Sequence, residues 1–402
     1  MNKKRTLSAL IYGFSKNFKI LLLTGARQVG KTTLLQNCSK SNRKYVTLDT
    51  TSDLLLAKND PNDFLLRYAP PVLIDEIQYA PEIFNYLKIL ADNSDKRGLV
   101  WMSGSQQFNM MKNVSESLAG RVAIMELFPF SIYEREDKAV LQKPFLPSNE
   151  IAGELKYKKT DETFEMIWQG AYPDVVGKEP ICREAFYDAY IKTYIERDVR
   201  QLVNIGSEIT FLTFLKVAAA RTGQELNLAN IAKDSDISPN TAKQWLSILQ
   251  ASGLVYLLRP YFKNTTKRLI KSPKLYFMDT GLAAYLSGWT TPQSLETGAS
   301  AGAFFETFVI SEVIKSYKHN ALMPDIYYFR DNNGNEIDLL IHQDGKFYPI
   351  EIKKTATPMP ADISAFKILG KFENLGQGAL ICLTEKVQPL SASANAISIW
   401  NI

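Results

Sequence analysis

The sequence predicts an α/β protein of several domains, and three patterns indicate this fold class. In the first third of the chain, short apolar runs alternate with helical stretches, as in a parallel sheet that helices cover on both faces. A glycine-rich loop follows the first of these runs, at residues 25–32. Near the C-terminus, two alternating runs flank Asp344-Gly345, a pair that favours a two-residue hairpin turn. At 402 residues the chain is too long for one ordinary core.

The composition is that of a soluble globular protein, with 46% hydrophobic and 22% charged residues. The net charge of +5 is compatible with nucleic-acid binding but does not require it. Cys38, Cys182 and Cys382 are widely separated and lack metal-ligand spacing, so we expect reduced thiols and a cytoplasmic location. No apolar run approaches the roughly 20 residues of a membrane helix, so we expect no membrane partner.

The glycine-rich loop fits the phosphate-binding pattern G-x-x-x-x-G-K-S/T at every fixed position. We assign nucleotide binding to the loop and the residue after it: Gly25, Ala26, Arg27, Gln28, Val29, Gly30, Lys31, Thr32 and Thr33. A strand at 19–23 and a helix from Thr33 onward place the loop as the pattern requires. Its N–H groups would contact phosphate oxygens, Lys31 would reach the β- and γ-phosphates, and the Thr32 hydroxyl would hold Mg²⁺. The expected cofactors are therefore ATP and Mg²⁺.

A second buried strand, at 72–76, ends in two acidic residues. Downstream of a phosphate loop, Asp75 is expected to complete the Mg²⁺ coordination, and Glu76 to orient or deprotonate the attacking water. Taken alone, an apolar strand that ends in two acids is more often structural than catalytic. The preceding phosphate loop favours the catalytic interpretation.

A third apolar run, at 99–102, leads into Ser103-Gly104-Ser105. Ser105 or Ser103 is a candidate to contact the γ-phosphate, and the alternative is an ordinary helix N-cap. A helix is expected at 108–119 and a strand at 122–125, with Arg121 between them. By itself, Arg121 can also be a surface residue of a helix-to-strand turn.

These motifs together resemble the AAA+ superfamily. The resemblance implies that Arg121 is an arginine finger that contacts the ATP of a neighbouring subunit, and hence that the chain forms a homo-oligomer. Residues 136–160 are polar and predict a domain boundary, and helical periodicity at 161–203 predicts a small lid or connector. In that segment, Arg197 and Arg200 either sense nucleotide or belong to a solvated helix face.

Two helices and a basic hairpin follow, an order typical of a winged helix. The first helix is expected at 226–232, and Ser238-Pro239 supplies an N-cap and a first-turn proline for the second, which runs to Ser252. The second helix turns four residues inward: Ala242, Trp245, Leu246 and Leu249. It leaves four outward: Asn240, Lys243, Gln244 and Ser247. The hairpin carries five basic residues: Lys263, Lys267, Arg268, Lys271 and Lys274.

A winged helix places its second helix in the major groove of DNA and its hairpin against phosphates. DNA is therefore the expected partner of this segment, and the five positive charges favour it. Winged helices also serve as protein-docking modules, so a protein partner stays open as an alternative.

The Asp344-Gly345 turn sets the register of the C-terminal hairpin. Counting outward gives three opposed pairs: Leu339 with Ile350, Asp338 with Glu351, and Glu336 with Lys353. The other face collects the apolar residues Ile337, Leu339, Ile341, Tyr348, Ile350 and Ile352. Two opposed acids are unfavourable unless a proton or a cation lies between them, which predicts Mg²⁺ or Mn²⁺ at Asp338 and Glu351. The alternative is a solvated strand face with an ion pair between Glu336 and Lys353.

An aspartate followed by Glu351-Ile352-Lys353 on a hairpin resembles the restriction-endonuclease-like core of metal-dependent nucleases. The resemblance implies that Glu306, on the preceding helix, joins Asp338 and Glu351 as a metal ligand. Lys353 would then orient the nucleophilic water or stabilise the transition state.

The whole chain resembles one family, the bacterial and archaeal AAA-type ATP-binding proteins with a C-terminal domain of unknown function. The motifs that follow the family's order are the phosphate loop and residues 118–121, 194–198 and 351–353. We accordingly divide the chain into four domains: a P-loop AAA+ parallel-sheet domain at 1–135, a helical connector at 136–205, a winged-helix module at 206–290, and a restriction-endonuclease-like α/β domain at 291–402.

The resulting hypothesis is an Mg²⁺-dependent ATPase whose nucleotide state controls a DNA-binding, nuclease-like C-terminal half. The alternative is a nucleotide-gated switch or scaffold that binds a protein partner and keeps the nuclease-like fold only as structure.

Overall fold

The computed structural model describes residues 3–39, 43–105, 117–148, 155–194, 208–262, 271–331, 333–372 and 374–402. Several sequence predictions lie outside these residues. They are most of the helix expected at 108–119, both arginines of the connector (Arg197 and Arg200), and three residues of the basic hairpin (Lys263, Lys267 and Arg268). Within the described chain, no helix combines the length and the apolar character needed to span a bilayer.

The N-terminal part is a five-stranded parallel sheet in the order β2-β3-β4-β1-β5. Its strands are β1 (Ile20–Thr24), β2 (Lys44–Thr47), β3 (Val72–Asp75), β4 (Val100–Ser103) and β5 (Val122–Glu126). Every residue of β1, β3 and β4 is buried, as expected for strands with helices on both faces. Because all five strands run in one direction, their carboxyl ends lie on one edge of the sheet. The loop after β1 and the acidic pair after β3 therefore meet there.

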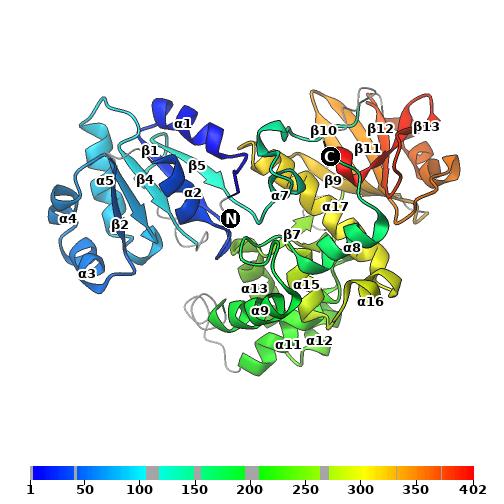
Figure 1. The fold of residues 1–402 in the computed structure, drawn as a ribbon, viewed down its shortest axis with the longest axis horizontal. Coiled ribbons are helices and arrows are strands. Elements are labelled where there is room, and N and C mark those ends of the chain that lie inside the picture. The colour runs from blue at the N-terminus through cyan, green and yellow to red at the C-terminus, as the bar shows by residue number, and fades with distance from the viewer. Residues whose placement is uncertain are drawn as a thin grey trace.

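Helices lie on both faces of this sheet (Figure 1). They are α1 (Ser8–Asn17), α2 (Lys31–Cys38), α3 (Thr51–Asn59), α4 (Pro61–Arg67) and α5 (Ile83–Asp92). Side chains of β1 alternate between two apolar clusters: Leu21 and Leu23 belong to one, and Ile20 and Leu22 belong to the other. This period of two confirms that the continuous apolar run is a strand buried on both sides.

The middle of the chain is mainly helical. It contains α7 (Ile132–Arg135), α8 (Thr160–Gln169), α9 (Pro180–Tyr194), α11 (Glu208–Ala219), α12 (Leu228–Asp234), α13 (Pro239–Ala251) and α15 (Thr280–Leu286). Three short strands, β6 (Gln224–Glu225), β7 (Val255–Leu258) and β8 (Lys274–Phe277), form an antiparallel sheet in the order β6-β8-β7. We call the described residues of 208–277 the middle module.

The second long helix of the middle module, α13, begins as the sequence predicts. The Ser238 hydroxyl accepts a hydrogen bond from the Thr241 N–H, and Pro239 is the first helical residue. The four residues predicted to face inward are buried, and the four predicted to face outward are exposed. Trp245 packs edge-on against Phe211 and Phe214 of α11, with ring centroids 5.0 and 5.4 Å apart.

Strands β7 and β8 form the predicted hairpin, but Lys274 is buried in it, so its prediction as one of the DNA-contacting basic residues was wrong. Lys274 is the first residue of β8, it pairs with Leu258 of β7, and it is 5% exposed. Lys271, three residues earlier, is exposed. A four-residue strand between two neighbours turns alternate side chains inward, and Lys274 lies on the side that meets the C-terminal part of the chain.

The C-terminal part is a six-stranded mixed sheet in the order β13-β14-β12-β11-β10-β9. Its strands are β9 (Ile326–Arg330), β10 (Glu336–Gln343), β11 (Lys346–Ile352), β12 (Gly378–Cys382), β13 (Gln388–Ser391) and β14 (Ala394–Ser398). Two helices, α16 (Pro292–Thr297) and α17 (Ala301–Lys318), precede the sheet. The 3₁₀ segments η4 (Pro360–Lys371) and η5 (Ile399–Asn401) follow β11 and β14.

The hairpin of β10 and β11 has the predicted turn and register near its tip, where Gln343 pairs with Lys346 and Leu339 with Ile350. The backbone pairing of the two strands ends at Leu339 and Ile350. Beyond it, the Asp338 carboxylate accepts a hydrogen bond from the Ile352 N–H at 2.9 Å. The face assigned to Ile337 was also wrong. The register with β9 shifts between Ile337 and Leu340, and this bulge turns Ile337 into the cluster of Leu340 and Leu369.

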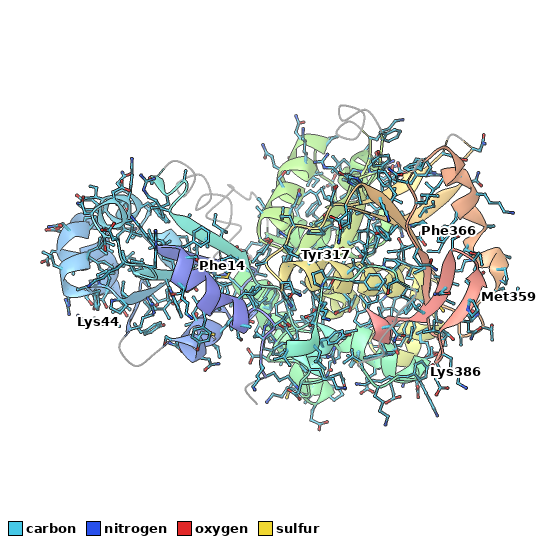
Figure 2. All side chains as sticks on the ribbon, turned by 90° about the horizontal axis from the view of Figure 1, so that it is seen from above. Phe14, Lys44, Tyr317, Met359, Phe366 and Lys386 are labelled. Carbon is cyan, nitrogen blue, oxygen red and sulfur yellow. The ribbon has the colours of Figure 1, made fainter. Side chains whose placement is uncertain are left out.

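Helix α17 is the central element of the molecule, with 14 of its 18 residues buried. In Figure 1 it lies between the C-terminal sheet and the segment that leaves β5. Tyr317, labelled near the centre of Figure 2, donates to the carbonyl of Phe145 at 2.9 Å. Glu312 and Lys315 form a buried ion pair at 2.9 Å. Helix α17 thus connects the segment after the N-terminal sheet to the C-terminal sheet.

Candidate functional site

The phosphate loop connects β1 to α2, and two glycines give it its shape. Gly25 has φ of 142° and Gly30 has φ of 90°, conformations that L side chains rarely adopt. A Cβ on Gly25 would lie 2.1 Å from the carbonyl oxygen of Leu127, the first residue after β5. The first glycine is therefore required by both backbone conformation and packing.

The ammonium of Lys31 lies inside this loop. Its Nζ donates to the carbonyl oxygens of Ala26 at 2.7 Å and Gly25 at 3.0 Å, and the side chain is buried. A buried ammonium beside main-chain N–H groups at a helix N-terminus provides the positive charge that a polyphosphate needs.

The carboxylate of Asp75, at the end of β3, accepts hydrogen bonds from hydroxyl groups of three other segments. The Thr32 hydroxyl lies 2.8 and 3.0 Å from its two carboxylate oxygens, Tyr45 donates at 3.2 Å, and Ser103 donates as well. Burial, followed by the Asp75 charge, raises the pKa of Tyr45 to about 12, so the phenol stays protonated. The structure therefore brings together Thr32 and Asp75, the two predicted Mg²⁺ ligands.

Glu76 follows Asp75 in a left-handed conformation with φ of 57°. This conformation is uncommon for a residue other than glycine and is often found at functional sites. The Glu76 carboxylate accepts a hydrogen bond from the Gln78 side chain. Burial raises its pKa above the usual value, opposed by the Gln78 hydrogen bond and the positive charge of Lys31. Glu76 thus has the surroundings of a general base near the loop.

The two serine candidates have different surroundings. Ser103, the last residue of β4, donates to Asp75, whereas the hydroxyl of Ser105 accepts from Gln78 at 3.3 Å. Both are buried. Through Gln78, Ser105 is connected to Glu76, and this arrangement favours Ser105 as the residue closer to the reacting phosphate.

Arg121 lies at the other end of the sheet. It directly precedes β5, and Ile20 pairs with Val122 at the end opposite to the phosphate loop. Its guanidinium makes two bonds to Asp92 of α5, at 2.5 and 3.0 Å. This hydrogen bonding lowers the pKa of Asp92. Arg121 is therefore held in place but lies about four strand residues, roughly 13 Å, from the loop of its own chain.

A pocket of about 760 Å³ adjoins the phosphate loop. Gly30, Thr33 and Asn37 form one wall, and the N-terminal segment with Thr6 and Pro173 forms others. A pocket of a few hundred to 1,000 Å³ is the size that small ligands occupy.

A second set of predicted residues gathers where the middle module meets the C-terminal sheet. Lys274 Nζ lies 2.5 Å from Glu336, 3.0 Å from Glu306 and 3.6 Å from Asp338. The predicted ligands Glu306 and Asp338 are thus brought together, but around an ammonium group. Among the described residues, no three His, Cys, Asp or Glu side chains are arranged to hold a metal ion.

Glu351 adjoins Asp338 and is 7% exposed, and its Oε1 has no hydrogen-bond partner. Burial and the neighbouring Asp338 raise the pKa of Glu351 to about 10. Lys353 turns away and pairs with Asp362 at 2.8 Å, with almost half of its side chain exposed. The alternative of an ion pair between Glu336 and Lys353 is therefore wrong, because Glu336 pairs with Lys274 and Lys353 with Asp362.

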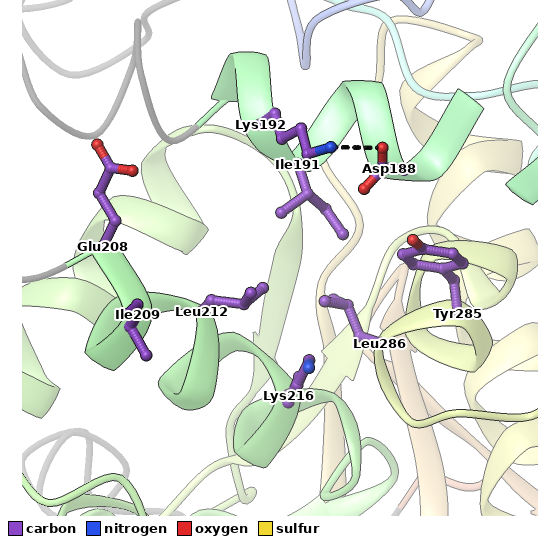
Figure 3. Close-up of a pocket in the computed structure, with 9 residues that line it drawn as sticks. All are labelled: Asp188, Ile191, Lys192, Glu208, Ile209, Leu212, Lys216, Tyr285 and Leu286. Carbon is purple, nitrogen blue, oxygen red and sulfur yellow. Dashed lines mark hydrogen bonds and ion pairs between the residues drawn. The ribbon is translucent and has the colours of Figure 1, made fainter. Parts of the chain in front are cut away.

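A separate pocket of about 540 Å³ lies between α9, α11 and α15 (Figure 3). Ile191, Leu212 and Leu286 give it an apolar floor, while Lys192 and Asp188 form an ion pair at its rim. None of the predicted site residues lines this pocket.

Comparisons with known proteins agree with the N-terminal geometry. A family model described as an AAA domain matches residues 17–136, and models described as domains of unknown function match 160–293 (DUF8612) and 301–402 (DUF4143). The chain is 31% identical over 345 residues to the uncharacterized protein Rv2008c of Mycobacterium tuberculosis, covering 84% of this chain and 71% of that protein. It is 23% identical over 346 residues to the uncharacterized protein MJ1544 of Methanocaldococcus jannaschii, covering 82% and 73%.

Two solved structures are also similar in part. The Drosophila ORC bound to DNA is 15% identical, covers 70% of this chain and 84% of that chain, and has a TM-score of 0.23. A STAND ATPase with a tetratricopeptide repeat sensor from Pyrococcus horikoshii is 12% identical, covers 80% and 49%, and has a TM-score of 0.28.

The parallel sheet, its phosphate loop and the acidic pair define a P-loop protein of the AAA type, a class of ATP-binding ATPases. This chain belongs to the family of the mycobacterial protein Rv2008c.

Sequence reasoning missed three residues of the two clusters. Tyr45 and Gln78 donate to Asp75 and Glu76, and Lys274 lies among the C-terminal carboxylates. Gln78 stands two residues after Glu76, a spacing that could have indicated the contact. Nothing local marks Tyr45 or Lys274, since their partners come from other segments.

We predict that Gln78→Leu shifts the acid limb of the ATP-hydrolysis pH profile to higher pH. The Gln78 hydrogen bond favours the charged form of Glu76, so its loss raises further a pKa that burial already raises. A base must be deprotonated, so activity falls as pH drops through this pKa. Initial rates at saturating ATP measure the limb. Ser105→Ala keeps the bond of Gln78 to Glu76 and should leave the limb in place; an unmoved limb in Gln78→Leu would contradict the assignment.

Proposed function

We propose that this chain is an Mg²⁺-dependent ATPase whose nucleotide state controls a DNA-binding C-terminal half. The observation that carries the ATPase part is the meeting of Lys31, Thr32, Asp75 and Glu76 at one edge of the parallel sheet. These residues supply an ammonium, a hydroxyl, a metal-binding carboxylate and a base, which are the parts that phosphoryl transfer from ATP to water requires.

The chemistry of the donors fits a magnesium ion. Thr32 and Asp75 would hold it, because hydroxyl and carboxylate oxygens are the ligands that Mg²⁺ prefers. When bound, Mg²⁺ would neutralise charge on the phosphate oxygens. Lys31 binds the phosphates, Glu76 orients and deprotonates the water, and Ser105 or Ser103 contacts the γ-phosphate. The nucleoside then occupies the pocket beside Gly30 and Thr33.

We predict that Lys31→Ala removes ATP binding, measured by calorimetry, whereas Glu76→Gln keeps binding and lowers kcat by at least about 100-fold. Lys31 supplies charge to the bound phosphates in every state, while Glu76 acts on water during the reaction. Gln36→Ala, an exposed change on α2, is the matched control and should behave as wild type. Normal hydrolysis by Lys31→Ala would refute the proposal.

Arg121 is proposed to act on a neighbouring subunit. Its position at the end of the sheet opposite to the phosphate loop prevents contact with the ATP of its own chain, and Asp92 fixes its direction. An arginine finger supplied by another subunit stabilises charge on the transferred phosphoryl group. The site is then complete only in a homo-oligomer.

We predict that Arg121→Ala lowers kcat by roughly 10³-fold without changing ATP affinity. Mixing Arg121→Ala with Lys31→Ala should restore part of the activity, since each subunit supplies what its neighbour lacks. Arg97→Ala, an exposed arginine before β4, serves as the control. A mixture that stays as inactive as its components would contradict action between subunits.

The proposed control of the C-terminal half is supported by contacts of the phosphate loop with two other parts of the chain. Gly25 packs on Leu127, and the next residue, Phe128, donates its N–H to Nε2 of His319 at the end of α17 at 3.4 Å. Burial, then the charges of Arg5 and Lys315, lower the pKa of His319 well below its usual value, so the neutral ring can accept.

The second contact connects the loop to the middle module. A Cβ on Gly253, just past the end of α13, would lie 3.7 Å from the N atom of Ala26. Gly253 therefore lies beside the loop, and we propose that a displacement of the loop by phosphate reaches α13, whose outward residues Asn240, Lys243 and Gln244 are exposed. We propose that the middle module is a winged helix and that α13 reads DNA.

We predict that duplex DNA changes the rate of ATP turnover and that Lys243→Ala weakens DNA binding. Loss of one phosphate contact should also lower the slope of log affinity against log salt by about 1. Fluorescence anisotropy and coupled ATPase assays measure the two effects. Lys192→Ala, at an exposed position of α9, is the control. Identical turnover with and without DNA would instead favour the alternative of a nucleotide-gated switch that binds a protein partner.

A further inference from the structure

The carboxylates of the C-terminal part surround one ammonium group. Glu306 comes from α17, Glu336 and Asp338 come from β10, and all three lie within 3.6 Å of Lys274 Nζ. Lys274 itself belongs to the middle module and is 5% exposed. Residues from two parts of the chain, far apart in sequence, thus form one buried ionic cluster.

The position of this ammonium is the one that a metal ion would need. Mg²⁺ lies about 2.1 Å from its oxygen ligands and requires several of them. Lys274 Nζ already lies between Glu306 and Glu336, at 3.0 and 2.5 Å, so an ion placed among these oxygens would overlap with it and be repelled by it. The arrangement does not fit a divalent cation while Lys274 is in place.

Strand pairing holds Lys274 there. Strand β8 is the middle strand of β6-β8-β7, and Lys274 pairs with Glu225 on one side and Leu258 on the other. Two residues on, Tyr276 points to the same side and donates to Glu306 at 2.5 Å. The ammonium therefore has a fixed origin in the backbone, and Glu306, one of its carboxylate partners, has a second fixed donor.

Neighbouring contacts join the same two parts of the chain. Arg330 of β9 pairs with Glu225 of β6 at 2.9 Å. The Tyr261 N–H, just past β7, donates to the carbonyl of Tyr328 at 2.7 Å, and the Tyr328 hydroxyl donates to the carbonyl of Ser272 at 2.7 Å. The ionic cluster lies among these contacts between the middle module and the C-terminal sheet. The same residues therefore neutralise the carboxylates and hold the two parts of the chain together.

We infer that Lys274 is the built-in counter-ion of the C-terminal carboxylate cluster, that it excludes a divalent metal from it, and that it locks strand β8 of the middle module to the C-terminal sheet. In this conformation the cluster connects the middle module to the C-terminal part and is not a metal-dependent cleavage centre. This inference does not depend on ATP hydrolysis, because neither residues nor contacts of the phosphate loop enter it.

The test compares the wild type with Lys274→Met and with the matched control Lys271→Met, an exposed lysine on the same segment. Thermal unfolding is recorded without nucleotide, in EDTA and with about 1 mM MnCl₂. We expect Mn²⁺ to cause no shift in the melting temperature of the wild type beyond any shift that Asp338→Asn also shows. Lys274→Met removes the ammonium from Glu306 and Asp338 and leaves Glu336 only Arg330, 4.0 Å away. It should therefore melt at a lower temperature than Lys271→Met and gain about 3 °C or more with Mn²⁺. Adding Glu306→Gln should remove that gain.

Two results would overturn the inference. The first is stabilisation of the wild type by Mn²⁺ that Asp338→Asn abolishes, which would show that metal enters beside Lys274. The second is a melting temperature of Lys274→Met equal to that of Lys271→Met, which would show that the ammonium balances nothing. If Lys274→Met does not fold, the wild type and Asp338→Asn still decide the question of metal entry.

Discussion

The buried ion pair of Glu312 and Lys315 on α17 is the interaction on which the arrangement of the domains depends. A pair of charges in the interior is tolerated only when further hydrogen bonds satisfy both groups. Here the Glu312 carboxylate also accepts the N–H of Ile132 at 2.9 Å, and Lys315 donates to the carbonyl of Phe130 at 3.2 Å. Both partners belong to the segment that leaves β5, so this segment cannot move away from α17 without leaving buried charges unsatisfied. The phosphate loop, packed on Leu127 of the same segment, is thereby connected to the C-terminal sheet.

The chain contains two groups of buried acids with different surroundings. Around Asp75 the nearest partners are neutral hydroxyls of Thr32, Ser103 and Tyr45, which orient the carboxylate but leave its charge uncompensated. Such a site favours a cation from solution. Around Asp338 the nearest cation is Lys274 of the chain itself. The same residue type is therefore proposed to hold a metal ion in one place, and contacts the ammonium of a distant segment in the other.

Local features of both groups could be predicted from the sequence, because they depend on neighbouring residues. The phosphate loop requires glycines at fixed positions, the Asp344-Gly345 turn fixes the register near it, and the period of α13 determines which residues it buries. One prediction that depended on propagating a local register failed, because the bulge between Ile337 and Leu340 reversed the face of Ile337. The strand pairing of β10 with β11 ends at Leu339 and Ile350, but Asp338 and Glu351 still lie together, and Asp338 raises the pKa of Glu351. The partners Tyr45 and Lys274 could not be predicted, since only the folded chain brings them to the acids.

The position of α17 explains how a change at the phosphate loop can reach the contacts around Lys274. The helix is 18 residues long, which corresponds to roughly 27 Å, and its interior contains no proline or glycine after Gly302 that would allow bending. Glu306 lies in its second turn and Lys315 in its last part, so one rigid body carries a partner of Lys274 at one end and the contacts to residues 128–132 at the other. A rigid helix transmits a shift at one end to the other without a chain of intermediate residues. The proposed coupling between nucleotide and the C-terminal half therefore requires only a displacement of the segment after β5.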